Sequence, residues 1–466
     1  MVRRGKPKIG IVPPALTSLL VLLTASPLVY LIHLMVKWAV DVPFWDQWDF
    51  APLLLKSYDG HVTFADLFAQ HNEHRLVFPR LVMLILARLT AWNTLYEQAA
   101  SVVFATGIWL VLAFLTRRVV RLAGSAGPIW AFPMISLVVF SLAQQENWFW
   151  GWQLQILMSV LAAVAGVALL AESWSSRTRF AGAIALGVVA AYSFASGVVC
   201  WPTGLFVLLL TGPSGWRRVL NARIGLWTAS AAISTGLYVR HFQRPPDYPP
   251  MDFFLTHPLA WLEYVCAYLG GPLMRYEPAA VVAGLVCLAL FCSSVWLILR
   301  MRLSKIEELS PLIGIASYAV GTAMLAGIGR AGASVHQALT SRYATSANLL
   351  WVCTIVLLYC LVAGEQRIGR SRKQKRVPLP TLVRRPAAVL IAIVLALVIV
   401  NSPRRVMEVE EHSRIRAALR AELELGEDPR GYAYQYAVYE VLYPQAERVF
   451  ERAPLLKKHH LSVYRD

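Results

Sequence analysis

Three aspartates, Asp41, Asp46 and Asp49, lie with Trp45 and Trp48 in the ten-residue stretch DVPFWDQWDF. A carboxylate can take a proton from an alcohol, and an indole ring can pack against a sugar or an apolar chain. Asp46 and Asp49 share one face if the stretch is helical, but point to opposite sides if it is a strand. The pattern predicts general-base chemistry. The alternative is that the acids cap a surface helix and pair with Arg75 or Arg80, while Trp45 and Trp48 anchor the membrane interface. We choose Asp46 as the base because it lies deeper in the aromatic motif, with Asp49 as its orienter or the second candidate.

A second polar cluster, HNEHR, supplies His71, Glu73, His74 and Arg75. The two histidines are three residues apart and lack the four-residue spacing of zinc proteases, so a metal site is not the favoured interpretation. An arginine can bind phosphate through two parallel hydrogen bonds. We therefore predict that this cluster binds substrate, with Arg75 contacting a phosphate. A metal site and a structural network of salt bridges stay open as alternatives.

Further along the chain, GRAGASVHQALTSRY carries Arg330 near its start and Arg342 near its end. This segment predicts a phosphate clamp, because the glycines allow close approach and the hydroxyl of Tyr343 can donate. The alternative is that both arginines reach lipid headgroups. In ENWFWGWQLQ, Trp150 and Gln153 are predicted to contact a sugar or prenyl chain, although the stretch is also typical of an aromatic belt at a membrane surface.

Composition decides what kind of elements position these residues. Hydrophobic residues make up 57% of the chain and charged residues 15%, and the mean hydropathy is +0.52. Repeated apolar runs long enough to cross a bilayer predict an all-α polytopic membrane protein, since backbone groups in lipid need internal hydrogen bonds. The net charge of +17 comes largely from short basic clusters between these runs. The clusters indicate cytoplasmic loops and not a nucleic-acid partner.

The distribution of basic loops predicts about eleven transmembrane helices, with the N-terminus in the cytoplasm and the C-terminus outside. Nine spans are expected at residues 9–36, 97–116, 129–143, 154–170, 224–239, 279–299, 311–328, 344–362 and 386–400. Two further spans flank YSFASGVVCWP, one on each side. The first apolar run is too long for a cleaved signal peptide. The chain is thus divided into a transmembrane domain, 1–400, and an exported helical tail, 401–466.

The first outer loop is expected to extend over residues 38–96. Within it, 76–92 predicts an amphipathic helix on the outer surface, with Arg80 and Arg88 reaching water, although this stretch could also enter the membrane. The spans contain few charges: none occurs in 279–299 or 344–364. Acids, histidines and arginines from six separate segments instead gather on the predicted outer side. That distribution disfavours an ion-coupled transporter, which needs charges near the bilayer centre.

The layout resembles the GT-C superfamily of integral membrane glycosyltransferases, which have many spans and a large first outer loop with acidic residues just after the first span. Here FWDQWD occupies the acidic position, HNEHR lies in the same loop, and 76–92 would be the surface-lying helix. One departure is that Gln47 and Trp48 separate the two acids, whereas many members have adjacent acids or one residue between them.

The resemblance implies transfer of a sugar, with inversion, from a polyprenyl-phosphate donor to a glycan, lipid or protein acceptor at the outer face of the cytoplasmic membrane. No cofactor is assigned, and a divalent metal stays open. The chain has no Gly-rich nucleotide-binding loop, which agrees with a lipid-phosphate donor. The rival hypotheses are a flippase or exporter of lipid-linked sugars, a non-catalytic assembly protein of the cell envelope, and a transferase of acyl or phosphoglycerol groups.

Overall fold

The computed structural model describes residues 13–122, 131–212, 221–246, 248–300, 306–363, 366–368, 375–377, 381–425 and 441–465. This part of the chain is helical apart from two short antiparallel hairpins, β1 (Gln70–His71) with β2 (His74–Arg75) and β3 (Gln366–Ile368) with β4 (Lys375–Val377). The prediction of an all-α protein is confirmed for these residues. The basic segment 213–220 and most of the basic loop around 369–380 lie outside the described residues.

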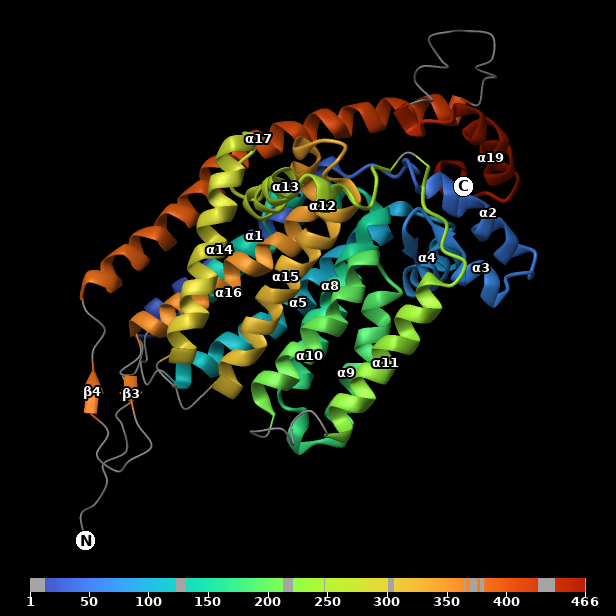
Figure 1. Cartoon of the computed structure of the whole chain (residues 1–466). Coiled ribbons are helices and arrows are strands. Elements are labelled where there is room, and N and C mark those ends of the chain that lie inside the picture. Colours follow the sequence, from blue (N-terminus) through green and yellow to red (C-terminus); the bar gives the residue numbers. More distant parts are fainter. Residues whose placement is uncertain are drawn as a thin grey trace.

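The long helices form one bundle (Figure 1). They are α1 (Pro14–Trp38), α5 (Thr94–Leu122), α6 (Ala131–Val139), α8 (Leu154–Ala171), α9 (Arg177–Ala191), α10 (Cys200–Thr211), α11 (Ala222–Val239), α13 (Pro258–Gly270), α14 (Glu277–Arg300), α15 (Ile306–Arg330), α16 (Ala344–Ala363) and α17 (Thr381–Leu425). Short helical turns join them: η1 (Leu142–Gln144), α7 (Gln145–Phe149), η2 (Gly151–Gln153), η3 (Ser173–Ser175), η4 (Ala195–Val199), α12 (Phe253–Thr256), η6 (Val335–Leu339) and η7 (Ser341–Tyr343).

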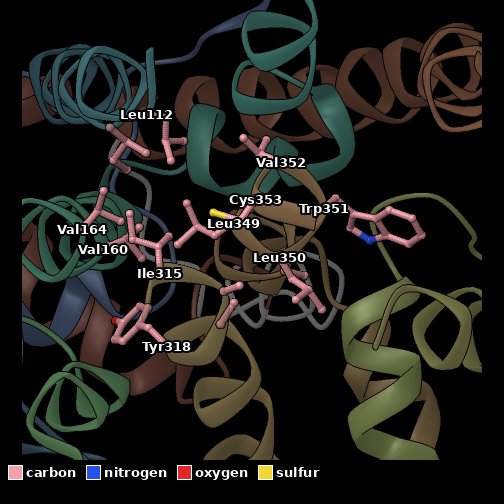
Figure 2. Close-up of a cluster of buried hydrophobic side chains, with 14 of the residues drawn as sticks. Leu112, Val160, Val164, Ile315, Tyr318, Leu349, Leu350, Trp351, Val352 and Cys353 are labelled. Atoms are coloured by element: carbon pink, nitrogen blue, oxygen red, sulfur yellow. The ribbon is translucent and has the colours of Figure 1, made fainter. Parts of the chain in front are cut away.

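The centre of the bundle is apolar and is built around α16. Leu349 and Cys353 of this helix pack with Val160 of α8 and Ile315 of α15 in one buried cluster (Figure 2). Helices α13 and α14 approach so closely that a Cβ on Gly270 or Gly284 would clash with the facing backbone. Small residues at such crossings are typical of helix packing in membranes, where close backbone contact replaces the hydrophobic effect.

Six helices of the described chain are long and apolar enough to cross a membrane. They span Pro14–Trp38, Thr94–Val119, Gly151–Ala171, Glu277–Arg300, Glu308–Arg330 and Ser341–Leu361. Each coincides with one of the eleven predicted spans. The other five predicted spans fall on α6, α9, α10, α11 and α17, and the total of eleven stays a prediction.

The first outer loop folds into α2 (Gln47–Tyr58), α3 (Phe64–Phe68), the β1–β2 hairpin and α4 (Val77–Thr90), gathered at one end of the bundle (Figure 1). Helix α4 exposes Leu81, Ile85 and Leu89 at four-residue intervals, which is the apolar stripe expected of a surface-lying helix. The prediction that Arg80 reaches water is wrong. Its side chain is buried and donates to the carbonyls of Leu67 and other residues at the end of α3.

The C-terminal part packs onto this same loop. Helix α19 (Ala446–Lys458) lies beside α2 (Figure 1), and its Val449 and Leu456 share a buried apolar cluster with Trp48 and Leu54 of α2. The turn η9 (Ser462–Tyr464) follows it. The predicted domain boundary at residue 400 falls inside α17, which is a continuous helix at that point. Most of the tyrosine-rich stretch GYAYQYAVYEVLY lies outside the described residues.

Candidate functional site

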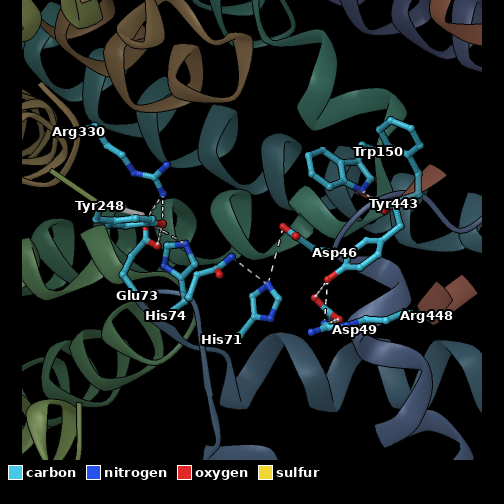
Figure 3. Close-up of polar contacts among 12 residues, drawn as sticks. Asp46, Asp49, His71, Glu73, His74, Trp150, Tyr248, Arg330, Tyr443 and Arg448 are labelled. Carbon is cyan, nitrogen blue, oxygen red and sulfur yellow. Dashed lines mark hydrogen bonds and ion pairs between the residues drawn. The ribbon is translucent and has the colours of Figure 1, made fainter. Parts of the chain in front are cut away.

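Polar side chains from several segments meet where the first outer loop covers the bundle (Figure 3). The start of α2 supplies Asp46 and Asp49, the β1–β2 hairpin supplies the histidines and Glu73, and the end of α15 supplies Arg330. The C-terminal segment adds residues from a distant part of the sequence. The ends of helices that meet here are the ends that the sequence predicts to be outside.

Asp46 is a carboxylate with few contacts. It occupies the N-cap position of α2 but makes no capping bond, and its carboxylate accepts no hydrogen bond from a described residue. The basic side chain within 4 Å of it is His71, whose Nε2 lies 3.8 Å from Asp46 Oδ2. The side chain of Asp46 is 27% exposed, so a substrate hydroxyl can reach it. The alternative that Asp46 serves as a helix cap is therefore not supported.

The backbone before Asp46 is held in an uncommon conformation. Trp45 has φ of 48°, in the left-handed region, which costs a residue with a side chain about 1 kcal/mol or more. Its N–H donates to the carbonyl of Leu442 at 2.7 Å. On the other side of Asp46, Gln47 donates to Glu97 of α5 at 2.6 Å and accepts from the N–H of Phe44 at 3.1 Å. These bonds fix the backbone that carries the acid.

The β1–β2 hairpin sets the two histidines opposite each other, so both lie on one face. Its two-residue turn places Asn72 at φ of 48°, a conformation that asparagine adopts more readily than most residues. The ring of His71 lies edge-on to Trp152 with 5.1 Å between centroids. The hairpin therefore presents His71 to Asp46 from a rigid turn.

His74 is buried and neutral. Its ring stacks on Phe194 at 4.2 Å, and its Nδ1 accepts the N–H of Ala195 at 3.1 Å, which leaves the proton on Nε2. Burial lowers the pKa of His74 to about 4, although the negative charge of Glu73 opposes this effect. At neutral pH His74 can thus donate a hydrogen bond but cannot serve as a cation.

Glu73 and Arg330 form an ion pair, with 2.8 Å between Glu73 Oε1 and Arg330 Nη2. The hydroxyl of Tyr248 donates to the other oxygen of Glu73, and the guanidinium lies 4.2 Å from the centre of the Tyr248 ring. Burial alone would raise the pKa of Glu73, but His74, Arg330 and Tyr248 together lower it to about 2. Arg330 therefore enters the site already paired with a carboxylate.

Arg342 differs from Arg330 in its partners. Its backbone N–H donates to Glu146 and its carbonyl accepts from Asn147, but its guanidinium has no hydrogen bond or ion pair with any described residue. The guanidinium lies within electrostatic range of Asp46 and Arg330. Of the two predicted clamp residues, Arg342 is the one whose guanidinium has all its donors free of described partners, whereas Nη2 of Arg330 is occupied. Its neighbour Tyr343 stacks on Tyr268 and accepts from Gln337.

Asp49 is the opposite of Asp46, because its oxygens are occupied. Tyr443 Oη donates to Asp49 Oδ2 at 2.9 Å, and Nη1 of Arg448 and of Arg452 donate to Oδ1 at 3.0 and 3.1 Å. Asp41 is also engaged: it accepts from the N–H and hydroxyl of Thr94 at the start of α5 and pairs with Arg465. Asp41 and Asp49 are therefore held in structural contacts, although with Arg465, Arg448 and Arg452 and not with Arg75 or Arg80, and Asp46 stands apart.

Several predicted contact residues face inward instead of toward a ligand. Arg75 donates to the carbonyls of Tyr238, Phe68 and Arg240, so its guanidinium is committed to backbone groups and not to a phosphate. The indole N–H groups of Trp48 and Trp150 donate to the carbonyls of Pro43 and Phe44, and both rings are buried. Gln153 is buried as well. Trp45, with 42% of its surface exposed, is the predicted tryptophan that can contact a substrate.

One group of described residues has the spacing of a cation site: ligand atoms of Asp46, Asp49 and His71 lie within 4.8 Å of one another. The two arginines and the tyrosine on Asp49 compete directly with a metal for its oxygens. Only one carboxylate and one imidazole then stay available. We assign no metal to this site.

Four site residues could not be found from the sequence. Tyr443, Arg448 and Arg452 reach Asp49 across 394 to 403 residues of chain. Arg416 of α17 lies 4.6 Å from the ring centre of Phe44 and donates to the carbonyl of Phe149. All four lie in or after α17, where an even mixture of acids and bases gives no sign of which side chains turn inward.

No family model, curated protein or solved structure matches this chain. The chemistry of the site therefore rests on its geometry. An accessible carboxylate lies beside an imidazole, and an unpaired guanidinium lies within electrostatic range of the carboxylate. Such an arrangement can deprotonate a hydroxyl and stabilise a phosphate.

Proposed function

We propose that this protein is a GT-C-like membrane glycosyltransferase, which moves a sugar from a polyprenyl-phosphate donor to an acceptor hydroxyl at the outer face of the cytoplasmic membrane. The single observation that carries the proposal is the contrast between two neighbouring acids. Asp49 is covered by two arginines and a tyrosine, whereas Asp46 is accessible and has, among the described residues, a single ion-pair contact, with His71 Nε2 at 3.8 Å.

In this reaction Asp46 takes the proton from the acceptor hydroxyl as its oxygen attacks the anomeric carbon. The new carbon–oxygen bond forms while the bond to the phosphate oxygen breaks, and the lipid phosphate leaves with the electron pair. A single displacement of this kind inverts the anomeric configuration. His71 lies beside the Asp46 carboxylate and can accept its proton after transfer.

Arg342 binds the phosphate in the ground state and as negative charge develops on the leaving oxygen. Arg330 takes part more weakly, since Glu73 already occupies one of its nitrogens. Exposed Trp45 offers an indole face to the sugar or to the first isoprene units. The acceptor can be a glycan, a lipid or a protein.

The proposal includes the membrane arrangement expected from the sequence. The six long apolar helices cross the bilayer together with α6, α9, α10, α11 and α17, which gives eleven spans, a cytoplasmic N-terminus and an external C-terminus. The clustering of polar groups at one end of the bundle supports a surface reaction over a flippase, because a flippase needs a polar path through the bilayer.

Native mass spectrometry tests the donor site. The purified protein is offered a panel of polyprenyl-phosphate sugars, beside an Arg342→Ala variant and an Arg414→Ala control on the exposed surface of α17. We expect selective retention of one lipid-linked sugar by the wild type and the control, and loss of retention in Arg342→Ala. Retention no better than that of ordinary phospholipids would contradict the proposal and favour an assembly protein or another transferase.

A further inference from the structure

We infer that the C-terminal segment, residues 441–465, is a working part of the proposed active site, in which Arg448 and Arg452 act as positioning residues. They neutralise Asp49 so that Asp46 alone serves as the charged base. The inference rests on the proposed function and goes beyond it by giving the two acids separate roles and by assigning one role to a distant segment.

The segment is attached to the loop that carries the acids by bonds at several places. The N–H of Trp45, next to Asp46, donates to Leu442, and the N–H of Ser462 donates to the carbonyl of Ala91 at 2.8 Å. Arg452 donates to the carbonyl of Trp48 as well as to Asp49. Together with the apolar cluster that α2 and α19 share, these bonds fix the position of the segment relative to Asp46 and Asp49.

The charges explain what the arginines do there. Carboxylate oxygens of Asp46 and Asp49 lie within 4.8 Å of each other, and two like charges so close resist joint ionisation. Arg448 and Arg452, 3.0 and 3.1 Å from Asp49 Oδ1, compensate its charge. The charge of Asp49 then no longer opposes a negative charge on Asp46. Two carboxylates thus take different roles because their environments differ.

Other ionisable groups also face the pair and stay unchanged in the test below. They are His71 and His74 from the hairpin, Arg342 from η7, Tyr443 from the C-terminal segment, and Glu97 from α5, which acts through Gln47. Since none of these groups is altered, a change in pH dependence reports the missing arginines.

The test compares pH–rate profiles of the full-length wild type and an Arg448→Gln/Arg452→Gln double variant. An uncompensated Asp49 makes deprotonation of Asp46 harder, so the acid limb of kcat/KM should move up by about one pH unit. The rate at pH 8 should stay within several-fold. A third variant, with Asp49→Asn added, should bring the acid limb back. The control is Lys457→Gln/Lys458→Gln, which removes the same charge from exposed positions of α19.

If the segment only stabilises the fold, the double variant should be less stable and slower at every pH. The acid limb of kcat/KM should then not shift, and adding Asp49→Asn should not restore the rate. That result would overturn the inference. The wild type also separates the two proposals, because a wild type without transferase activity refutes the proposed function alone.

If the wild type shows no transferase activity, the effect of the two arginines on the charge beside His71 is measured from the ring signals of ¹³C-labelled His71 during a pH titration. The midpoint should rise in the double variant and return with Asp49→Asn. An unchanged midpoint would refute the inference, whatever the reaction is.

Discussion

Replacing Glu73 by glutamine removes the carboxylate that holds Arg330 and Tyr248 together. In the folded protein its pKa is about 2, against an ordinary value of 4.5. At about 1.36 kcal/mol for each pKa unit, this difference corresponds to roughly 3 kcal/mol of stability at neutral pH. Because the folded-state pKa is the lower one, this contribution is fully present above about pH 5 and is lost as the pH falls through 2.

The linkage relation gives the size of the effect at each pH. The contribution of Glu73 falls to roughly 1 kcal/mol at pH 3 and is nearly lost at pH 2. In the Glu73→Gln variant this contribution is absent at every pH. The difference in unfolding free energy between the wild type and the variant should therefore shrink by about 2 kcal/mol between pH 7 and pH 3. The unpaired Arg330 adds a cost that does not depend on pH in this range.

Urea unfolding of the detergent-purified proteins, followed by tryptophan fluorescence, measures this difference at both pH values. Glu410→Gln is the control, because its ion pair with Arg414 is exposed and should leave no pH-dependent difference. A difference between wild type and Glu73→Gln that stays constant from pH 7 to pH 3 would refute the reasoning. It would mean that His74, Arg330 and Tyr248 do not together hold Glu73 ionised.

Three further predictions concern other parts of the molecule. Asp46→Asn should lower the rate of sugar transfer by roughly a hundred- to ten-thousand-fold at unchanged donor binding. The control, Asp59→Asn at the exposed end of α2, should leave the rate unchanged. If Asp46→Asn and the wild type transfer sugar at the same rate, Asp46 is not the base. Arg465→Ala should cost about 3 kcal/mol in urea unfolding, because it leaves the carboxylate of Asp41, 2% exposed, without its cation. Gly284→Leu should prevent α13 and α14 from packing and lower the yield of folded protein, whereas Gly225→Leu, where a side chain meets open space, should not.

The sequence was sufficient to predict the helical class, the six confirmed long apolar helices and the gathering of the first-loop acids with HNEHR. These predictions depend on local patterns: apolar length, basic loops and acids that follow a span. The spacing of Asp46 and Asp49 also predicted that they would share one side if the stretch were helical, and α2 begins directly after Asp46.

Which acid is accessible could not be predicted, because the partners of Asp49 come from α19 and were brought there by tertiary packing. The tryptophans show the same limit. An indole has an apolar body and one N–H donor, so a sugar, a lipid surface and a protein core can each accommodate it. Trp150 lies in the core because the carbonyl of Phe44 meets its N–H, and no local pattern encodes that contact.

The attachment of residues 441–465 to the first loop also has a consequence in time. Tyr443 is synthesised 394 residues after Asp49, which at about 5–20 residues per second is an interval of about 20–80 s. During that interval the first helices can already be in the membrane while Asp41 and Asp49 lack their arginines. A ribosome that stalls within α17 leaves a chain whose first loop is synthesised but lacks its contacts with residues 441–465. The site is therefore complete only after the C-terminal segment has been synthesised.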